Sequence, residues 1–300
     1  MRAALATAEL AEAVGPVAGV EIVVWSGDGP VPEGVVDLWV PHYATGANVI
    51  DRGHELRGLR WVQLQTAGYD GVAERLPGGV TLCNAAGVHD DATAEHAVGL
   101  IIAGLRGIAE AVRAHGHWGP MPGRRSLADS RVLILGYGSI GRALAERLVP
   151  MKAVVTAVAS SERDDDLVGR VRAAADLPEL LPDQHVVVVL VPLTDATMGL
   201  IDDHFLSHLR DGALIVNVAR GPVVDTDAVL RHAGRLSFAL DVTDPEPLPD
   251  GHPLWNAPDV LITPHVAGGT TAMMPRLAAL VRAQLVRAVA GEPLHNVVSD

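Results

Sequence analysis

The stretch from Leu133 to Arg163 reads LILGYGSIGRALAERLVPMKAVVTAVASSER, and it indicates how a large part of the chain folds. A short apolar strand comes first, and glycines follow it at positions 136, 138 and 141. The pattern from Ser139 to about Leu148 is that of a helix, and a second apolar run leads to Ala159. This order of strand, glycine turn, helix and strand is typical of dinucleotide-binding domains.

The three glycines have separate expected functions. Gly136 permits the tight turn, Gly138 lets a pyrophosphate approach the backbone, and Gly141 lets the helix pack closely on the strand. The helix N-terminus offers free N–H groups and a partial positive charge to the phosphates. We therefore predict cofactor contacts at Gly136, Tyr137, Gly138, Ser139, Ile140 and Gly141.

The end of the second strand bears on which cofactor binds. A carboxylate at this place would bind both hydroxyls of the adenosine ribose and repel a 2′-phosphate, but the chain has Ala159 there. Ser160 and Ser161 can donate hydrogen bonds, and Arg163 can pair with a phosphate. These residues favour NADP(H) over NAD(H), while Glu162, which could reach the ribose after a short shift, keeps NAD(H) open.

Short runs rich in Val, Ile and Leu recur along the chain, and most are separated by stretches long enough for a helix. This alternation predicts parallel sheets covered by helices on both faces. The runs are 21–25, 35–40, 61–65, 80–82, 131–135, 153–158, 185–191, 213–218, 237–242 and 260–263.

Two longer helices are expected, from Asp91 to about Arg113 and from Thr271 to about Ala290. They frame the block that contains the glycine turn. We therefore expect a dinucleotide-binding domain at 99–270 and a second domain built from 1–98 and 271–300.

Composition narrows the possible partners. The chain has 300 residues, 49% of them hydrophobic, and a net charge of −13 without a cluster of Lys and Arg, which argues against nucleic acid and anionic membranes as partners. Its one cysteine, Cys83, cannot form an intrachain disulfide, and no apolar run has the length of a membrane span. No cluster has the spacing of metal ligands, so no metal is expected. We expect a cytoplasmic protein.

Three polar residues follow predicted strands, at the edge where open α/β sheets bind ligands. They are Arg220 in IVNVARGPVV (215–224), Glu246 in ALDVTDPEPLP (239–249) and His265 in VLITPHVAGGT (260–270). Together with LQTAGYDGV (64–72) and AGEPLHNVV (290–298), these motifs resemble the D-isomer-specific 2-hydroxyacid dehydrogenases, which include glyoxylate/hydroxypyruvate reductases.

The resemblance implies an α/β fold with two doubly wound parallel-sheet domains and a cleft between them. One would be a Rossmann NAD(P)-binding domain and the other a smaller flavodoxin-like substrate domain. It also implies a homodimer built through the nucleotide-binding domain. The reaction would be hydride transfer between a nicotinamide cofactor and C2 of a small 2-keto or D-2-hydroxy acid.

The resemblance also assigns residues. His265 matches the acid/base residue, Glu246 its carboxylate partner, and Arg220 the residue that binds the substrate carboxylate and polarises the carbonyl. The backbone N–H groups of Ala67 and Gly68 would bind the same carboxylate. Further cofactor contacts are expected at Val191, Pro192, Thr197, Val218, Ala219, Asp241, His265 and Gly268.

Two other functions remain open at this point. A phosphoglycerate dehydrogenase would need more cations for its substrate than the four arginines among the first 60 residues supply. A dinucleotide-sensing protein without catalysis would not need Arg220, Glu246 and His265 together. The glutamate at 246 also favours keto-acid chemistry, because the formate dehydrogenases that resemble this family have glutamine there.

Overall fold

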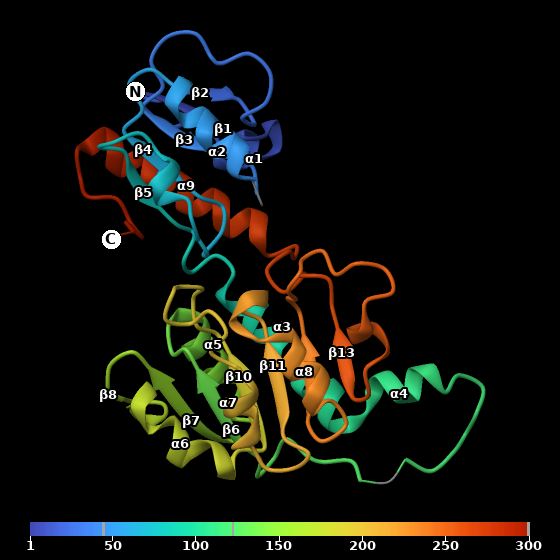
Figure 1. Ribbon diagram of the computed structural model, residues 1–300. Helices are drawn as coiled ribbons and strands as arrows, with labels where there is room; N and C mark the ends of the chain where they lie inside the picture. Colours follow the sequence, from blue (N-terminus) through green and yellow to red (C-terminus); the bar gives the residue numbers. More distant parts are fainter. Residues whose placement is uncertain (44–45, 122, 299–300) are drawn as a thin grey trace. The chain divides into compact units, whose positions relative to one another are not determined.

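The computed structural model describes residues 1–43, 46–121 and 123–298. The chain divides into two compact units, Met1–His89 with Gly269–Asp300 (unit 1) and Asp90–Gly268 (unit 2). Unit 1 is blue, cyan and red in Figure 1, and unit 2 runs from green to orange. The boundary expected at residue 98 falls inside a helix that lies wholly in unit 2.

Unit 2 is built on an eight-stranded sheet in the order β13-β12-β11-β10-β6-β7-β9-β8. All neighbouring strands are parallel except β8, which runs antiparallel to β9. Both faces of the central strands are buried, which accounts for their unbroken apolar sequences. The strands are β6 (Arg131–Leu135), β7 (Val154–Ala159), β8 (Arg163–Asp165), β9 (Gly169–Ala173), β10 (Val186–Val189), β11 (Leu214–Asn217), β12 (Ser237–Leu240) and β13 (Val260–Ile262).

Helices cover both faces of this sheet. On one face α3 packs against α5, β11 and β12, and on the other α7 packs against α8 over a separate apolar core. The expected doubly wound architecture is thereby confirmed for unit 2. The helices are α3 (Asp90–Arg106), α4 (Ile108–Arg113), α5 (Ser139–Leu148), α6 (Leu177–Leu180), α7 (Asp203–Ser207) and α8 (Thr226–His232).

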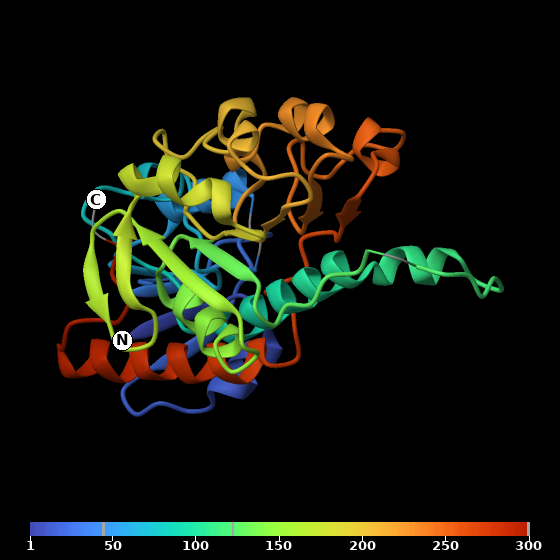
Figure 2. The ribbon, with the colours of Figure 1, turned by 90° about the horizontal axis from the view of Figure 1, so that it is seen from below.

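The single helix expected from Asp91 to Arg113 is wrong, because Gly107 separates α3 from α4. Gly107 has φ +63° in the left-handed region, where a helix cannot continue. The Arg124 guanidinium lies directly over it, since a Cβ on Gly107 would be 2.3 Å from Arg124 Cζ. Beyond this break, α4 and residues 114–121 after it project from the rest of unit 2 (Figure 2).

Unit 1 holds a five-stranded parallel sheet in the order β2-β1-β3-β4-β5, the flavodoxin-like order. Helices α1 and α9 pack together on one face, and Trp39 lies in a core on the other. The sequence did not reveal β1, which is an alanine-rich segment. The elements are β1 (Arg2–Leu5), α1 (Ala8–Val14), β2 (Glu21–Val24), β3 (Leu38–Val40), α2 (Ala47–Asp51), β4 (Trp61–Gln63), β5 (Thr81–Cys83) and α9 (Met273–Ala290).

Short 3₁₀ helices make up the remaining helical segments of the described residues. They are η1 (Arg52–Glu55), η2 (Ala73–Arg75), η3 (Ala174–Asp176), η4 (Leu181–Asp183), η5 (Gly221–Val223) and η6 (Pro253–Asn256). Cys83 is fully buried in unit 1, and burial raises the pKa of its thiol to about 11. Among the described residues, no helix is both long enough and apolar enough to cross a membrane.

Candidate active site

The glycine turn after β6 has the geometry that the sequence predicts. Gly136 has φ +107°, and a Cβ on it would lie 2.5 Å from the carbonyl carbon of Leu190. A Cβ on Gly141 would lie 2.4 Å from the carbonyl oxygen of Gly136, so α5 packs tightly on the turn. A Cβ on Gly138 would meet nothing within 4 Å. Two glycines are therefore required by packing, and the middle one leaves open space above the turn.

The same turn fits a dinucleotide. Helix α5 begins at Ser139, and its N-cap Gly138 makes no side-chain capping hydrogen bond. The first N–H groups of a helix have no acceptor within the helix, so here they can donate hydrogen bonds to phosphate oxygens. Gly136, Tyr137, Gly138, Ser139, Ile140 and Gly141 would hold the pyrophosphate.

The adenosine side of the turn lies where β7 ends at Ala159. Ser160 and Ser161 are exposed, and Glu162 forms an ion pair with Arg170. Arg163 donates a hydrogen bond from Nη2 to the carbonyl oxygen of Tyr137 at 2.6 Å. Glu162 is therefore engaged by the neighbouring strand β9, while Arg163 lies against the glycine turn.

Below this turn, a polar cluster ties the β8–β9 hairpin to α5. The Tyr137 hydroxyl donates to Asp165 at 3.1 Å, and burial together with this carboxylate raises the pKa of Tyr137 to about 12. Arg142 donates to both Asp165 and Asp166. Burial opposes ionisation of Asp165, but two backbone N–H groups, Tyr137 and Arg142 outweigh it and hold the carboxyl pKa below its usual value.

The other predicted cofactor residues lie along the same edge of the sheet. Val191 and Pro192 follow β10, Val218 and Ala219 follow β11, Asp241 follows β12, and Gly268 lies beyond β13. Because these strands are parallel neighbours of β6, their carboxyl ends share the edge that carries the glycine turn. Thr197 donates from Oγ1 to the carbonyl oxygen of Pro192 at 2.6 Å, which fixes the loop after β10.

His265 and Glu246 form a hydrogen-bonded pair at this edge. The distance between His265 Nδ1 and Glu246 Oε1 is 2.6 Å, and the two side chains are 44% and 42% exposed. His265 has φ +52°, a left-handed conformation that is uncommon for a residue with a side chain. Its own N–H donates to the carbonyl oxygen of Asp241 at 2.7 Å.

The carboxylate of Asp241 holds this turn in place. Asp241 is 1% exposed, and its oxygens accept hydrogen bonds from the N–H groups of Val266 at 3.0 Å and Ala267 at 2.9 Å. The Thr263 hydroxyl donates to it at 2.6 Å, and His96 Nε2 on α3 lies 3.2 Å from the same oxygen. Both oxygens thus have protein donors, and the contact with the nicotinamide that the resemblance implies stays a prediction.

Sequence reasoning missed His96 and Thr263. His96 lies in an alanine-rich helix far from Asp241 in the chain, so only the packing of α3 on the sheet brings the two together. Thr263 was expected only as the end of a strand, although the Thr-Pro-His order placed a hydroxyl two residues before the predicted acid/base residue.

Arg220 is held by the turn after β11. Its Nη1 donates to the carbonyl oxygen of Ala219 at 2.7 Å. The fully buried Asn217 donates from Nδ2 to the carbonyl oxygen of Arg220 and accepts from the N–H of Ala219, both at 3.0 Å. Asn217 is a further residue that the sequence analysis did not single out, and its signal was an amide at the end of an otherwise apolar strand.

The loop that carries Glu246 packs against η5. A Cβ on Gly221 would lie 1.9 Å from the carbonyl oxygen of Thr243, so only glycine fits beside this loop. The Thr226 hydroxyl donates to the carbonyl oxygen of Asp244 at 2.7 Å. Gly221, directly after Arg220, therefore helps to position the loop of the second predicted catalytic residue.

Ala67 and Gly68 lie in a tight loop of unit 1. Their carbonyl oxygens accept hydrogen bonds from Asn84 Nδ2 at 2.9 Å and from the Thr66 hydroxyl at 2.7 Å, respectively. Among the described residues, no acceptor lies within hydrogen-bond distance of either backbone N–H group, so both are available to an anion. A hollow of about 160 Å³ adjoins this loop and is lined by His42, Ile50, Leu64, Gln65, Thr66, Gly68, Tyr69, Asp70 and Val72.

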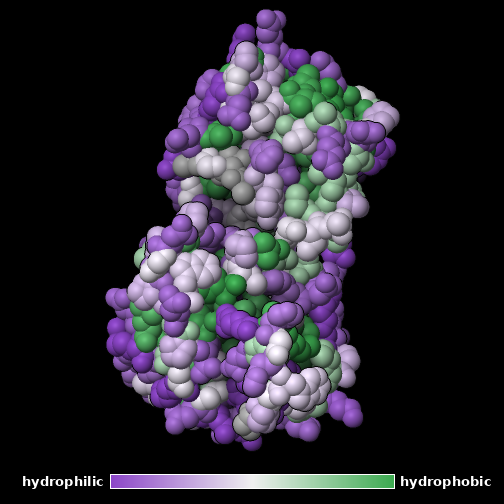
Figure 3. Space-filling view, turned by 90° about the vertical axis from the view of Figure 1, so that its right-hand side faces the viewer, coloured by the Kyte–Doolittle hydropathy of each residue, from purple (hydrophilic) through white to green (hydrophobic). Residues whose placement is uncertain are grey.

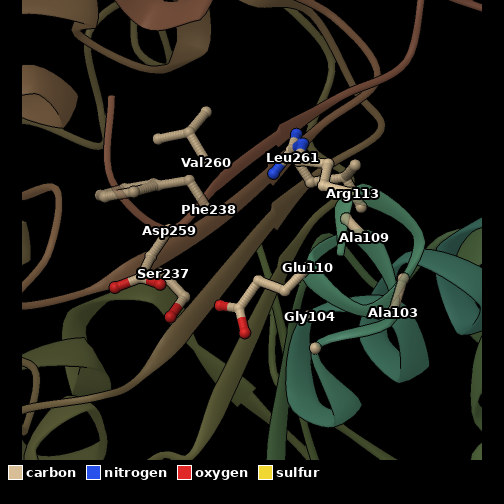
Figure 4. Close-up of a pocket in the computed structure, with 11 residues that line it drawn as sticks. Ala103, Gly104, Ala109, Glu110, Arg113, Ser237, Phe238, Asp259, Val260 and Leu261 are labelled. Atoms are coloured by element: carbon tan, nitrogen blue, oxygen red, sulfur yellow. The ribbon is translucent and has the colours of Figure 1, made fainter. Parts of the chain in front are cut away.

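A second hollow, of about 50 Å³, lies at the amino ends of β12 and β13 (Figure 4). Its lining includes Ala103 and Gly104 of α3, Glu110 and Arg113 of α4, and Asp259 before β13. The carboxyl ends of the same strands carry Asp241 and His265. Because it opens at the amino ends and is small, this hollow is separate from the candidate site.

Comparison with known proteins places these residues in a family. The family model described as D-isomer specific 2-hydroxyacid dehydrogenase, NAD binding domain, matches residues 98–267, which is more than half of the chain. The chain belongs to this family. The resemblance of its motifs is thereby confirmed, and so is the oxidoreductase class.

Two curated relatives in this family are reductases of small keto acids. A glyoxylate reductase from Thermofilum pendens is 33% identical over 78% of this chain and 73% of its own length. The human glyoxylate reductase/hydroxypyruvate reductase is 29% identical over 92% of this chain and 90% of its own length.

Solved structures agree in fold over the whole chain. The NADPH-dependent glyoxylate/hydroxypyruvate reductase from Sinorhizobium meliloti, in complex with NADP and sulfate, is 26% identical. The match covers 99% of this chain and 98% of that one, with a TM-score of 0.83. The two-domain α/β architecture is therefore shared.

Proposed function

We propose that this dehydrogenase reduces small 2-keto acids to D-2-hydroxy acids with a nicotinamide cofactor. The observation that carries the proposal is the 2.6 Å contact between His265 and Glu246 at the sheet edge that also holds the glycine turn and Arg220. Family membership and the glyoxylate reductases among the relatives support the same class of reaction.

In this proposal His265 supplies the proton. Its Nδ1 faces Glu246, so Nε2 is the ring nitrogen left to exchange a proton with the C2 oxygen of the substrate. Glu246 fixes the ring orientation and balances the charge of the protonated ring. A bound nicotinamide would supply the hydride for C2, and the uncapped α5 with its open glycine turn supports binding of such a cofactor.

Arg220 would bind the substrate carboxylate and polarise the C2 carbonyl. A guanidinium can do both, because it stays charged and presents several N–H donors in one plane. Unit 1 offers binding groups of its own. The free N–H groups of Ala67 and Gly68 would suit a carboxylate. The hollow beside them, with His42 and Tyr69 in its lining, would suit a small organic group.

We further propose that NADP(H) is preferred to NAD(H). Ala159 removes the carboxylate that would repel a 2′-phosphate, and the exposed Ser160 and Ser161 can donate to that phosphate. Arg163 lies against the glycine turn through its hydrogen bond to the carbonyl oxygen of Tyr137, and Glu162 is engaged in an ion pair with Arg170.

A homodimer formed through unit 2 completes the proposal. Ile108 and Val112 of α4 are 46% and 69% exposed, and Trp118 in the following loop is fully exposed. The face that includes this projecting segment carries apolar patches among hydrophilic residues (Figure 3). Exposed apolar side chains on a projecting segment are typical of a surface that another subunit covers. The family resemblance makes a second copy of this chain the partner.

The dimer is tested by the Val112→Glu variant. A charge in a covered apolar surface is expected to shift the protein from dimer to monomer in analytical ultracentrifugation. Val24→Glu is the matched control, because Val24 is 53% exposed in unit 1 and its replacement should leave the dimer intact. A monomeric wild-type protein would contradict the proposal.

One assay separates the possible functions. Glyoxylate, hydroxypyruvate, pyruvate, longer 2-keto acids and phosphohydroxypyruvate are each offered with NADPH and with NADH. We expect turnover of the small unphosphorylated acids, and we expect this turnover to be faster with NADPH than with NADH. Turnover of phosphohydroxypyruvate alone would favour a phosphoglycerate dehydrogenase, and cofactor binding without any turnover would favour a sensor.

A further inference from the structure

Basic side chains gather at the amino-terminal edge of the unit 2 sheet, opposite the edge that carries His265. Arg131 begins β6, His185 directly precedes β10, and Arg210 precedes β11 by a few residues. Strands β6, β10 and β11 are parallel neighbours, so these three side chains start from adjoining positions. Arg125 lies in the segment leading to β6, and the charge of Arg210 lowers its pKa.

His185 lies between two hydrogen-bond donors. Its Nδ1 accepts from the backbone N–H of Arg131 at 2.8 Å, and its Nε2 lies 2.8 Å from Arg210 Nη1. A neutral imidazole whose Nδ1 accepts must have its proton on Nε2, and a guanidinium has donors only. The Nε2–H of His185 and an N–H of Arg210 therefore face each other without an acceptor between them.

The carboxylates near this cluster are already paired. Asp183 lies 2.8 Å from Arg131, and Asp211, next to Arg210, lies 3.1 Å from Arg235. Among the residues that the structure describes, no carboxylate pairs with Arg125 or Arg210. Burial, and then the charge of Arg210, lower the pKa of Arg125, while burial, Arg210, Arg125 and Arg131 lower that of His185.

We propose that Arg125, Arg210 and His185 form a binding site for a phosphate-type oxyanion. Two guanidinium groups offer the parallel donors that phosphate oxygens accept, and the Nε2–H of His185 would gain the acceptor that it lacks. The anion would also neutralise the local positive charge of Arg125 and Arg210, although the chain as a whole has a net charge of −13. The free anion and the phosphate group of a small phosphomonoester present the same chemistry here.

The site lies apart from the proposed reaction. His265, Arg220 and the glycine turn follow the carboxyl ends of the strands, whereas Arg125, His185 and Arg210 lie before their amino ends. Bound phosphate should therefore stabilise unit 2 without competing for the substrate, because a ligand that binds only the folded state raises its stability.

The test measures phosphate binding to the full chain by calorimetry and by thermal unfolding, with sodium chloride at equal ionic strength as reference. NADP is kept saturating so that the glycine turn is filled, and glycerol 3-phosphate forms a second arm. We expect saturable binding by the wild type and binding at least about tenfold weaker in Arg125→Gln/Arg210→Gln. Equal binding by both proteins, or an equal effect of chloride, would overturn the proposal.

Two further variants keep the result interpretable. Arg172→Gln/Arg231→Gln changes the charge by the same amount at arginines paired with Asp176 and Asp203, and it should bind phosphate as the wild type does. Without phosphate, Arg125→Gln/Arg210→Gln should unfold no earlier than the wild type, because it removes like-charge contact. Should that variant fail to fold, Arg210→Gln alone must still weaken phosphate binding several-fold. Unchanged affinity would reject the site whatever the activity assay gives.

Discussion

Two turns at the same edge of the unit 2 sheet are held in different ways. The turn with His265, after β13, surrounds a carboxylate that is 1% exposed and has backbone, hydroxyl and imidazole donors. The turn after β7, with Ser160 and Arg163, is exposed and is anchored by surface contacts with Arg170 and Tyr137.

The difference indicates what each turn can tolerate. A buried polar group left without its partner costs about 1–3 kcal/mol, whereas an exposed ion pair contributes about 0–1 kcal/mol. The His265 turn is therefore a fixed arrangement, which suits a proton donor that must meet the substrate with a set geometry. Substitutions in the turn after β7 should have little effect on folding stability, which suits a segment that selects between two cofactors.

The largest effect is expected when the proton donor of the fixed turn is removed. In His265→Asn, kcat/KM for glyoxylate with NADPH should fall about 10²–10⁴-fold, because general acid catalysis is lost. The free energy of unfolding should change little, since the side chain is 44% exposed. His204→Asn, at an exposed histidine, is the control. Full activity in His265→Asn would remove the proposed mechanism.

The next largest effect should come from the carboxylate beneath the turn. In Asp241→Asn an amide NH₂ must face one of the present donors, which should lower the free energy of unfolding by about 1–3 kcal/mol. The displaced His265 should lower kcat/KM by up to about 10²-fold. Urea unfolding and steady-state kinetics measure both, with the exposed Asp250→Asn as control. A variant that loses activity at unchanged stability would instead favour direct contact of Asp241 with the cofactor.

The structures of these two turns could be predicted from the sequence to different extents. The glycine turn and the strands that precede Arg220 and His265 could be predicted, because the turn requires glycine and these strands are largely apolar. The left-handed conformation of His265 and its support by His96 could not. They depend on a helix that lies far away in the chain and packs on the sheet.

The turn after β7 was harder to predict for another reason. The acidic run from Asp164 to Asp166 gave no sign that it begins an antiparallel hairpin. Because the charge on Arg170 of that hairpin's second strand determines where Glu162 lies, the sequence around Ser160 left the cofactor open. The long helix expected to reach Arg113 failed similarly, since the position of Arg124 over Gly107 is a tertiary contact.

The smallest effect is expected in the exposed turn, and it concerns affinity alone. In Arg163→Ala, the Kd for NADPH should rise about tenfold and that for NADH should stay unchanged, because a charge-assisted hydrogen bond to the 2′-phosphate is lost.

Arg170→Ala should also weaken the preference for NADPH, but by acting on Glu162. This substitution releases Glu162 from its ion pair, so that its carboxylate can accept hydrogen bonds from the ribose hydroxyls and repel the 2′-phosphate. The Kd for NADH should therefore fall, and the Kd for NADPH should rise. Fluorescence titration of both variants with both cofactors measures this. An NADPH affinity that neither variant alters would show that the turn after β7 does not select the cofactor, and only the contrast in folding stability between the two turns would remain.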